Sequence, residues 1–145
     1  MTSMMTWLDP YLPFLALSRS PGSARTSLDE DLGLIARSGV SHLICLQEPF
    51  ELELFDESIE SRKQAVESHG ITFTHEPIED FGPPTVEQMN RLHELVTSCE
   101  THSQKVLIHC QAGLGRAGTV AACFMRSKMH SPQGAIAMMR YMRPG

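Results

Sequence analysis

The sequence has little positive charge, because 12 lysines and arginines face 17 aspartates and glutamates and leave a net charge of −5. Binding to the phosphates of a nucleic acid requires clustered lysine and arginine, so this charge balance argues against a nucleic-acid-binding surface. Long hydrophobic runs are also missing, and the apolar stretches are far too short to span a bilayer. No basic region followed by an apolar core stands at the start of the chain, so we expect no secretory signal and a cytoplasmic location.

Cysteine and histidine are too dispersed to suggest a metal site. The 4 cysteines and 7 histidines form no Cys-x-x-Cys or His-x-x-x-His pair. We therefore expect no metal, no cofactor and no disulfide framework. The remaining composition, 41% hydrophobic and 20% charged, is that of an ordinary globular protein. We predict a single monomeric domain over residues 1–145, with an irregular segment over 1–25 in which three prolines exclude a long helix.

One run of the sequence, His-Cys-Gln-Ala-Gly-Leu-Gly-Arg at residues 109–116, carries a recognisable chemistry. The thiol of Cys110 is a nucleophile once it is ionised. Gly113 and Gly115 let the backbone curl so that successive N–H groups converge on the oxygens of a ligand. The guanidinium of Arg116 is able to hold two phosphate oxygens at once. This spacing favours covalent transfer of a phosphoryl group; the simpler alternative is that Cys110 is a core cysteine ahead of a helix.

The flanking residues place this loop between a strand and a helix. Residues 106–109 are typical of a buried strand, and residues 118–126 of a buried helix. A helix N-terminus at the carboxyl end of a strand favours a bound anion and the thiolate form of Cys110. We expect His109 to support the loop by hydrogen bonding, although an ordinary strand-end histidine is the alternative. The residues predicted to bind the phosphate are Gln111, Ala112, Gly113, Leu114, Gly115 and Arg116.

The rest of the chain alternates helical and strand patterns. Ser27 and Thr85 each open a capping box, and Gly39 and Gly70 are typical helix-closing residues. This alternation predicts an α/β fold with a central, mostly parallel sheet of four to five short strands flanked by helices. The predicted helices are 27–37, 56–68, 85–99, 118–126 and 131–142, the strands are 40–47, 71–75 and 106–109, and residues 12–17 form a short edge strand.

The His-Cys-x5-Arg pattern resembles the signature of the cysteine-dependent protein tyrosine phosphatases, and the chain is similar to their small dual-specificity members. The likeness covers residues 7–145 and includes segments 15–18, 75–80 and 131–136. It implies a phosphoprotein substrate, with phosphotyrosine first and phosphoserine or phosphothreonine as further candidates. It also implies a phosphocysteine intermediate on Cys110. Members of this size generally continue past Arg-Pro-Gly into another helix, so we expect that this chain either is truncated or lacks that element.

Thiolate attack needs a proton donor for the departing oxygen, and Asp80 is the candidate. It lies in a loop marked by glycine and proline, and it matches the aspartate of the family's Pro-Ile-x-Asp segment. Glu79 is the fallback acid, and a solvated turn residue is the alternative for Asp80. Phe81 is expected either at the mouth of the cleft or in packing.

The residue after the arginine departs from the family pattern. Most members carry serine or threonine there, and its hydroxyl assists the breakdown of phosphocysteine, whereas this chain has Ala117. Thr119 is not expected to replace that hydroxyl, because residues i and i+2 of a helix do not share a face. The resemblance therefore implies a competent first step and a slowed second step.

Several alternatives stay open. Relatives that act on phosphoinositides often carry lysine in the loop, so its uncharged residues disfavour a lipid substrate. A phosphate-binding module with little turnover would keep the same loop, and an arsenate reductase or sulfurtransferase would also use a reactive thiol. Cys45 is a candidate for a protective disulfide with Cys110, as in some relatives, although a buried apolar role is favoured.

Overall fold

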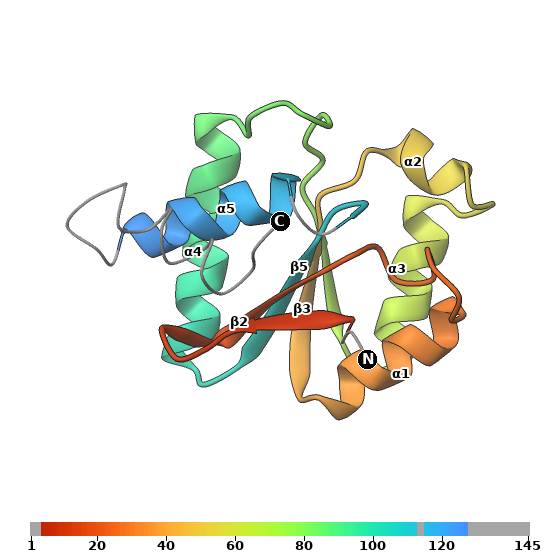
Figure 1. Cartoon of the computed structure of the whole chain (residues 1–145), viewed down its shortest axis with the longest axis horizontal. Helices are drawn as coiled ribbons and strands as arrows, with labels where there is room; N and C mark the ends of the chain where they lie inside the picture. Colours follow the sequence, from red (N-terminus) through yellow and green to blue (C-terminus); the bar gives the residue numbers. More distant parts are fainter. Residues whose placement is uncertain (1–3, 113–114, 128–145) are drawn as a thin grey trace.

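The computed structural model describes residues 4–112 and 115–127, and it shows one five-stranded sheet between helices (Figure 1). The strands lie in the order β1-β2-β5-β3-β4. β1 and β2 run antiparallel, whereas β5 is parallel to both of its neighbours and β4 is parallel to β3. The predicted α/β fold with a mostly parallel central sheet is therefore confirmed. The strands are β1 (Met5–Leu8), β2 (Leu12–Ser18), β3 (Val40–Cys45), β4 (Thr72–His75) and β5 (Lys105–His109).

Residues 1–25 are irregular only in part, contrary to the prediction from their prolines: of the residues described there, 5–8 and 12–18 form β1 and β2. The predicted strand at residues 12–17 is confirmed as β2, but its expected place at an edge is wrong, since β2 lies between β1 and β5. Pro13 fits because the pairing of β1 with β2 is irregular there: Trp7 lies opposite Ala16, but Leu8 lies opposite Leu12. A proline lacks an N–H for the ladder and is tolerated at such an irregularity.

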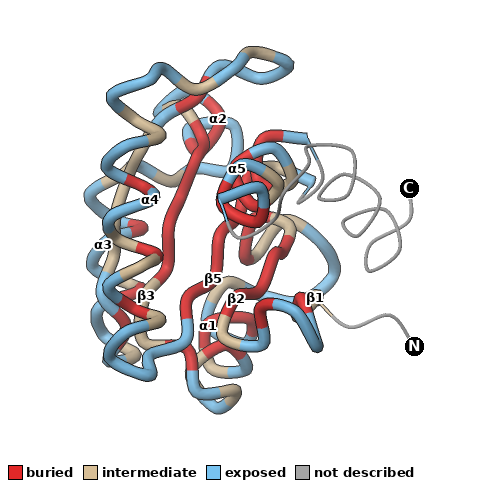
Figure 2. Tube along the Cα trace, turned by 90° about the vertical axis from the view of Figure 1, so that its left-hand side faces the viewer, coloured by how far each residue is buried: buried red, intermediate tan, exposed pale blue. Residues whose placement is uncertain are grey.

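Two helical layers cover the sheet, and each encloses its own hydrophobic core. α4 (Val86–Thr101) and α5 (Gly115–Arg126) pack on one face, and α1 (Leu28–Arg37) and α3 (Ile59–Ser68) pack on the other. A short helix that the sequence patterns do not predict, α2 (Pro49–Glu53), follows β3. Figure 2 shows the buried strands enclosed by helices whose outer faces are exposed.

Helix ends follow largely from local sequence. The side-chain oxygens of Ser27 and Thr85 cap α1 and α4 as predicted, each accepting a backbone N–H three residues on. Gly39 and Gly70, just after α1 and α3, adopt φ angles of +90° and +77°, which glycine takes without strain. α3 begins three residues later than predicted, because Ser58 caps it. The predicted helix 131–142 lies outside the described residues, and no helix within them is long and apolar enough to cross a bilayer.

Candidate active site

The Cys110 loop lies at the carboxyl edge of the sheet, directly after β5. α5 begins at Gly115, three residues earlier than predicted, so Arg116 lies in its first turn. The first backbone N–H groups of a helix have no partner within the helix, and they favour an anion. The predicted phosphate-binding residues Gly113 and Leu114 lie outside the described residues. Because it lies between β5 and α5, the Cys110 loop has the strand-to-helix setting that the sequence predicts.

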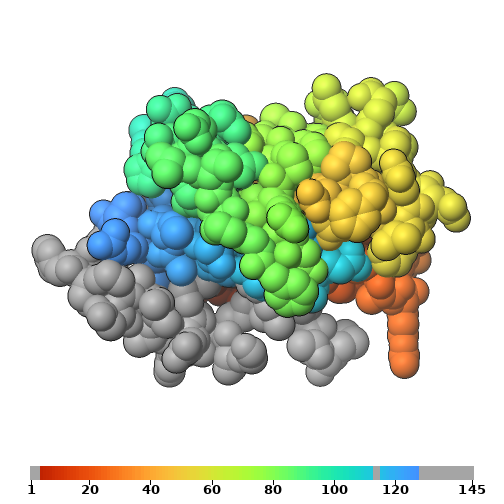
Figure 3. Space-filling model, turned by 90° about the horizontal axis from the view of Figure 1, so that it is seen from above, coloured from red at the N-terminus to blue at the C-terminus, as the bar shows by residue number. Residues whose placement is uncertain are grey.

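A cavity of about 390 Å³ opens beside this loop. It brings Cys110 and Arg116 together with Asp80 and Phe81, which come from a distant part of the sequence. Cys110 is 3% exposed and Phe81 is fully exposed, so the cavity extends from a buried thiol to an open aromatic rim. In Figure 3 the segment around residue 80 lies between α2 and α5 on the upper face. The remaining lining residues are Gly82, Gln111, Ala112, Gly115 and Thr119. A larger hollow of about 660 Å³ beside α1 has no cysteine in its lining.

The guanidinium of Arg116 is buried and held by a carboxylate. Its Nη1 and Nη2 each donate to an oxygen of Glu51 at 2.8 Å, and Nη1 also donates to the carbonyl of Ile78 at 3.0 Å. Burial alone would lower the pKa of Arg116, but the hydrogen bonds and charge of Glu51 outweigh it and raise that pKa. Burial works against the charge of Glu51 as well, yet Arg116 holds its pKa below the ordinary value. Arg116 is therefore a fixed cation.

One edge of the same guanidinium is left for a ligand. Nε of Arg116 is buried and has no hydrogen-bond partner among the described residues, and it lies 3.6 Å from Oδ1 of Asp80. Within residues 4–112 and 115–127, Nη2 donates only to Glu51, and its second N–H has no acceptor there. An arginine fork binds an oxyanion through two such N–H groups in parallel. The Nε–Nη2 edge is suited to hold two oxygens of a phosphate.

Asp80 lies at the mouth of the cavity in a tight turn. Its side chain is 54% exposed, and its Oδ1 accepts the N–H of Phe81 at 3.0 Å. Phe81 has a φ of +64°, in the left-handed region that costs a non-glycine residue about 1–2 kcal/mol. Strain in an exposed residue beside the candidate acid is typical of a functional site. Glu79, the fallback acid, is not among the residues that line the cavity.

His109 is buried beneath the loop. Its Nδ1 lies 3.2 Å from the carbonyl oxygen of Cys110, a geometry in which Nδ1 carries the proton and donates it. Burial, together with the charges of Arg62 and Arg116, lowers the pKa of His109 to about 3. The imidazole is therefore neutral at physiological pH, and its Nδ1 donates to the carbonyl of Cys110.

Ala117 and Thr119, the first and third residues after the arginine, occupy different faces of α5. Ala117 is completely buried in the hydrophobic core. Thr119 lines the cavity, but its hydroxyl donates to the carbonyl of Gly115 at 3.0 Å. This arrangement agrees with the expectation that the two positions occupy different faces of the helix.

Cys45 has the buried apolar role that the sequence analysis favours. It is 0% exposed, and burial raises the pKa of its thiol to about 11. It belongs to the core between the sheet and α1, whereas Cys110 belongs to the core on the opposite face. The two thiols thus pack in different cores.

Sequence reasoning missed Glu51, the carboxylate that holds Arg116. It lies in an acidic stretch that also contains Glu48 and Glu53, and only its burial distinguishes it from them. One local signal was available, because a proline at the first helical position followed by glutamate two residues later is typical of a helix start. That signal predicts α2, but it does not predict that Glu51 pairs with Arg116.

Comparison with known proteins extends over almost the whole chain. A family model described as "Swiss Army Knife protein, DSP-PTPase phosphatase domain" matches residues 3–145. The chain is 31% identical over 136 residues to cyclin-dependent kinase inhibitor 3 of Rattus norvegicus, covering 90% of this chain and 63% of that protein. The match therefore covers less than two thirds of the length of this curated relative.

Two solved structures have a similar fold. The first is kinase associated phosphatase with its catalytic-site cysteine replaced by serine, at a TM-score of 0.87 and 27% identity, covering 99% of this chain and 85% of that one. The second is Tk-PTP in its active form, at a TM-score of 0.80 and 32% identity, covering 100% and 88% of the two chains.

Proposed function

This chain belongs to the DSP-PTPase phosphatase family, as its His-Cys-x5-Arg pattern indicates, and on that premise we propose that it hydrolyses phosphomonoesters in proteins. The observation that carries the proposal is the cavity in which the thiol of Cys110, the carboxylate of Asp80 and the free edge of Arg116 converge. Phosphotyrosine is the first candidate substrate, with phosphoserine and phosphothreonine next, and the proposed location is cytoplasmic.

In the first step the thiolate of Cys110 attacks phosphorus, and a P–S bond forms while the ester P–O bond breaks. The departing oxygen takes the electron pair of that bond and a proton from the carboxyl group of Asp80. Charge grows on the three remaining phosphoryl oxygens, where the Nε–Nη2 edge of Arg116 and the N–H groups at the start of α5 stabilise it. The product is phosphocysteine and a free hydroxyl group.

In the second step water attacks phosphorus, and the P–S bond breaks. The thiolate of Cys110 is regenerated, the carboxylate of Asp80 takes a proton from the water, and inorganic phosphate leaves. His109 stays neutral through both steps, since its pKa is lowered to about 3. Its N–H keeps the carbonyl of Cys110 occupied, which restrains the backbone at the nucleophile.

The lining of the cavity supports a protein substrate. Gln111, Ala112 and Gly115 are uncharged, so they offer no extra cation for the additional phosphates of a phosphoinositide. The exposed ring of Phe81 at the rim is suited to contact an aromatic phosphate ester or an apolar neighbour of the phosphorylated residue.

Hydrolysis of p-nitrophenyl phosphate and of a phosphotyrosyl peptide tests the proposal. Cys110→Ser is expected to abolish hydrolysis of both, because a hydroxyl is a far weaker nucleophile than a thiolate. Asp80→Asn is expected to reduce peptide hydrolysis by roughly 10² to 10⁴-fold, and p-nitrophenyl phosphate hydrolysis less, because nitrophenolate leaves without a proton. No hydrolysis together with retained phosphopeptide binding would instead identify a binding module, and preferential hydrolysis of a phosphoinositide would replace the protein substrate with a lipid.

We propose further that breakdown of phosphocysteine limits turnover, because Ala117 offers no hydroxyl. Rapid-mix kinetics on p-nitrophenyl phosphate should show a burst of one nitrophenolate per enzyme, followed by slow turnover. Ala117→Ser should speed the slow phase by about 10- to 100-fold, the value of a hydrogen bond to a charged group of about 1.5–3 kcal/mol. Ala122→Ser, the same change further along α5, serves as the control. A slow phase that Ala117→Ser leaves untouched would contradict this proposal.

A further inference from the structure

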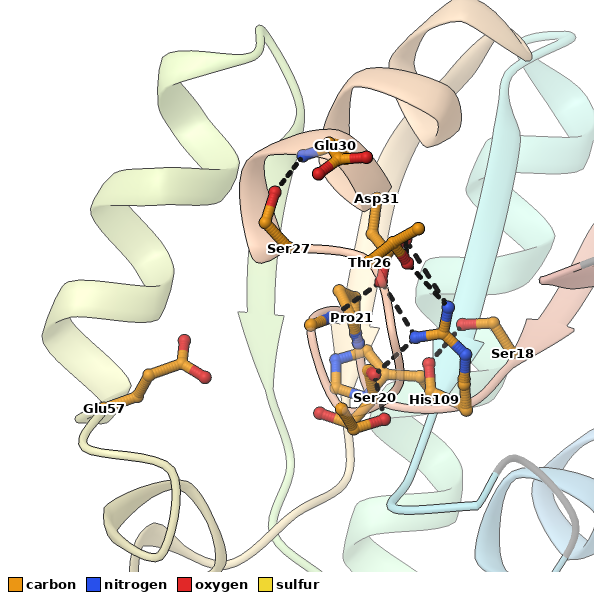
Figure 4. Close-up of polar contacts among 12 residues, drawn as sticks. Ser18, Ser20, Pro21, Thr26, Ser27, Glu30, Asp31, Glu57 and His109 are labelled. Atoms are coloured by element: carbon orange, nitrogen blue, oxygen red, sulfur yellow. Dashed lines mark hydrogen bonds and ion pairs between the residues drawn. The ribbon is translucent and has the colours of Figure 1, made fainter.

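A second group of buried polar side chains lies behind the Cys110 loop, and the proposed chemistry does not use it. Ser20, Gln47 and Arg62 are 2%, 0% and 1% exposed. They come from three parts of the chain: the turn after β2, the residue two positions beyond β3, and α3. Figure 4 shows the turn with Ser20 and Pro21, close to the N-terminal end of α1.

Hydrogen bonds connect these side chains into one network. Arg62 donates from Nε and Nη2 to the carboxylate of Glu57 at 2.9 and 2.8 Å, and from Nη2 to the carbonyl of Pro21 at 3.1 Å. Its Nη1 also donates to Oγ of Ser20 at 3.4 Å. The hydroxyl of Ser20 donates to Oε1 of Gln47 at 2.7 Å. The network thus extends from α3 to the side-chain amide of Gln47.

The network ends at the residue next to the nucleophile. Nε2 of Gln47 donates to Oε1 of Gln111 at 2.7 Å, and the backbone N–H of Ser20 donates to the carbonyl of Gln111 at 2.9 Å. The side chain and the backbone of Gln111 are therefore both bound to the same group of residues. The turn itself is held from the other side, because the N–H of Gly22 donates to Oδ2 of Asp31 at 2.7 Å.

The carbonyl contact determines where the next N–H points. In a trans peptide the C=O of one residue and the N–H of the following residue point in opposite directions. Since the C=O of Gln111 points at the N–H of Ser20, the N–H of Ala112 points away from Ser20. Ala112 lines the cavity that also contains Cys110 and Arg116. The contact therefore selects the orientation of a peptide at the lining of this cavity.

Stability alone does not account for such a network. A buried ion pair loses so much hydration that an apolar replacement of similar volume is often equally stable. Polar groups that are buried at this cost are better explained by the geometry that they impose.

We propose that Ser20, Gln47 and Arg62 are positioning residues that hold the Gln111–Ala112 peptide in the orientation that binds an oxyanion. The proposal rests on the proposed function, because it assigns a role in binding the phosphoryl group. None of the three residues touches the substrate, and each acts through Gln111.

The test is phosphate binding, measured by titration calorimetry with inorganic phosphate, together with kcat and KM for p-nitrophenyl phosphate. Gln47→Met keeps the length of the side chain but removes both amide contacts, and it should weaken phosphate binding by about 10-fold and lower kcat. In Gln47→Glu the carboxylate still accepts from the hydroxyl of Ser20, and it accepts from the side chain of Gln111 once the amide of Gln111 rotates. This variant should therefore recover most of the phosphate binding that Gln47→Met loses. Ser20→Ala, which keeps the backbone N–H, should have a smaller effect than Gln47→Met.

The matched control is Val66→Ala, one turn after Arg62 on α3. Val66 is completely buried in the core on the α1 side of the sheet, so this change should lower the thermal midpoint without changing phosphate affinity. Phosphate affinity in Gln47→Met and Ser20→Ala equal to that of the wild type would overturn the inference. If the wild type neither binds phosphate nor hydrolyses the ester, both the proposed function and this inference fail. If the wild type is active and the variants bind phosphate as tightly as it does, only this inference fails.

Discussion

Arg116 and Arg62 are two buried arginines that use the same side chain in opposite ways. Their side chains are 2% and 1% exposed, and each forms a two-point ion pair with a glutamate. Arg62 presents its Nε–Nη2 edge to Glu57 and its other nitrogen to Ser20. Arg116 presents its Nη1–Nη2 end to Glu51, which leaves the Nε edge free beside Asp80. The same pair of residue types thus forms a structural tie in one place and a candidate anion site in the other.

The orientation of the carboxylate explains the difference. A guanidinium has five N–H groups in a fixed plane, so a glutamate that takes one edge leaves another. Because the side-on Nε–Nη2 edge of Arg62 is occupied, a second anion has no equivalent edge to bind. Glu51 instead pairs with the Nη1–Nη2 end of Arg116. This contact neutralises part of the charge of Arg116 and fixes the plane of its guanidinium.

Replacing the two arginines by lysine should give the largest contrast. Arg116→Lys keeps the charge but loses the planar fork, and kcat/KM for p-nitrophenyl phosphate should fall by roughly 10² to 10³-fold. Arg62→Lys should reduce it by about 10-fold or less, since Arg62 acts only through the loop. Circular dichroism of both variants checks that the fold is intact. Equal losses in the two variants would mean that the free edge of Arg116 has no special role.

Removing the charge of Glu51 tests how the fixed cation is held. Glu51→Gln breaks a buried ion pair, and the free energy of unfolding should fall by about 3–5 kcal/mol in urea denaturation at pH 7. The pKa of Glu51 is held below its ordinary value, so the contribution of the pair is fully present above about pH 4.3. It is lost as the pH falls through the lower pKa of the folded state. Wild-type stability should therefore decline with acid more steeply than that of Glu51→Gln, and parallel profiles would contradict this reasoning.

The smallest effect is expected at a third pair, which lies at the surface. Arg91 donates from Nε and Nη2 to Glu76 at 2.8 and 2.9 Å, the same side-on geometry as in Arg62, but its side chain is 57% exposed. Water competes for the exposed guanidinium of Arg91, whereas the side chain of Glu76 is 12% exposed. Arg91→Met should therefore leave kcat/KM unchanged within error and lower the thermal midpoint less than Arg62→Lys does. A loss comparable with that of Arg62→Lys would show that burial is not what separates the pairs.

The local features of the chain were predictable because they depend on neighbouring residues. The capping contacts of Ser27 and Thr85, the closing glycines Gly39 and Gly70, and the strand-to-helix setting of the Cys110 loop all follow from short patterns. β1 and the interior position of β2 were missed, because β2 pairs with β5, which comes much later in the chain. Prolines that discourage regular structure locally were outweighed by this distant pairing.

The residues of the candidate site likewise include some that short sequence patterns predict and others that depend on contacts between distant segments. The sequence by itself identified the candidate nucleophile, arginine and acid, because their chemistry and spacing depend on two short segments. Only the tertiary structure decided that Glu51 orients Arg116, that Gln47 and Ser20 hold Gln111, and that Arg62 is a tie rather than a second anion site. The physical reason is that burial and hydrogen-bond geometry belong to contacts between distant segments. Acidic and amide residues that look alike in the sequence acquire different roles when the sheet brings them together.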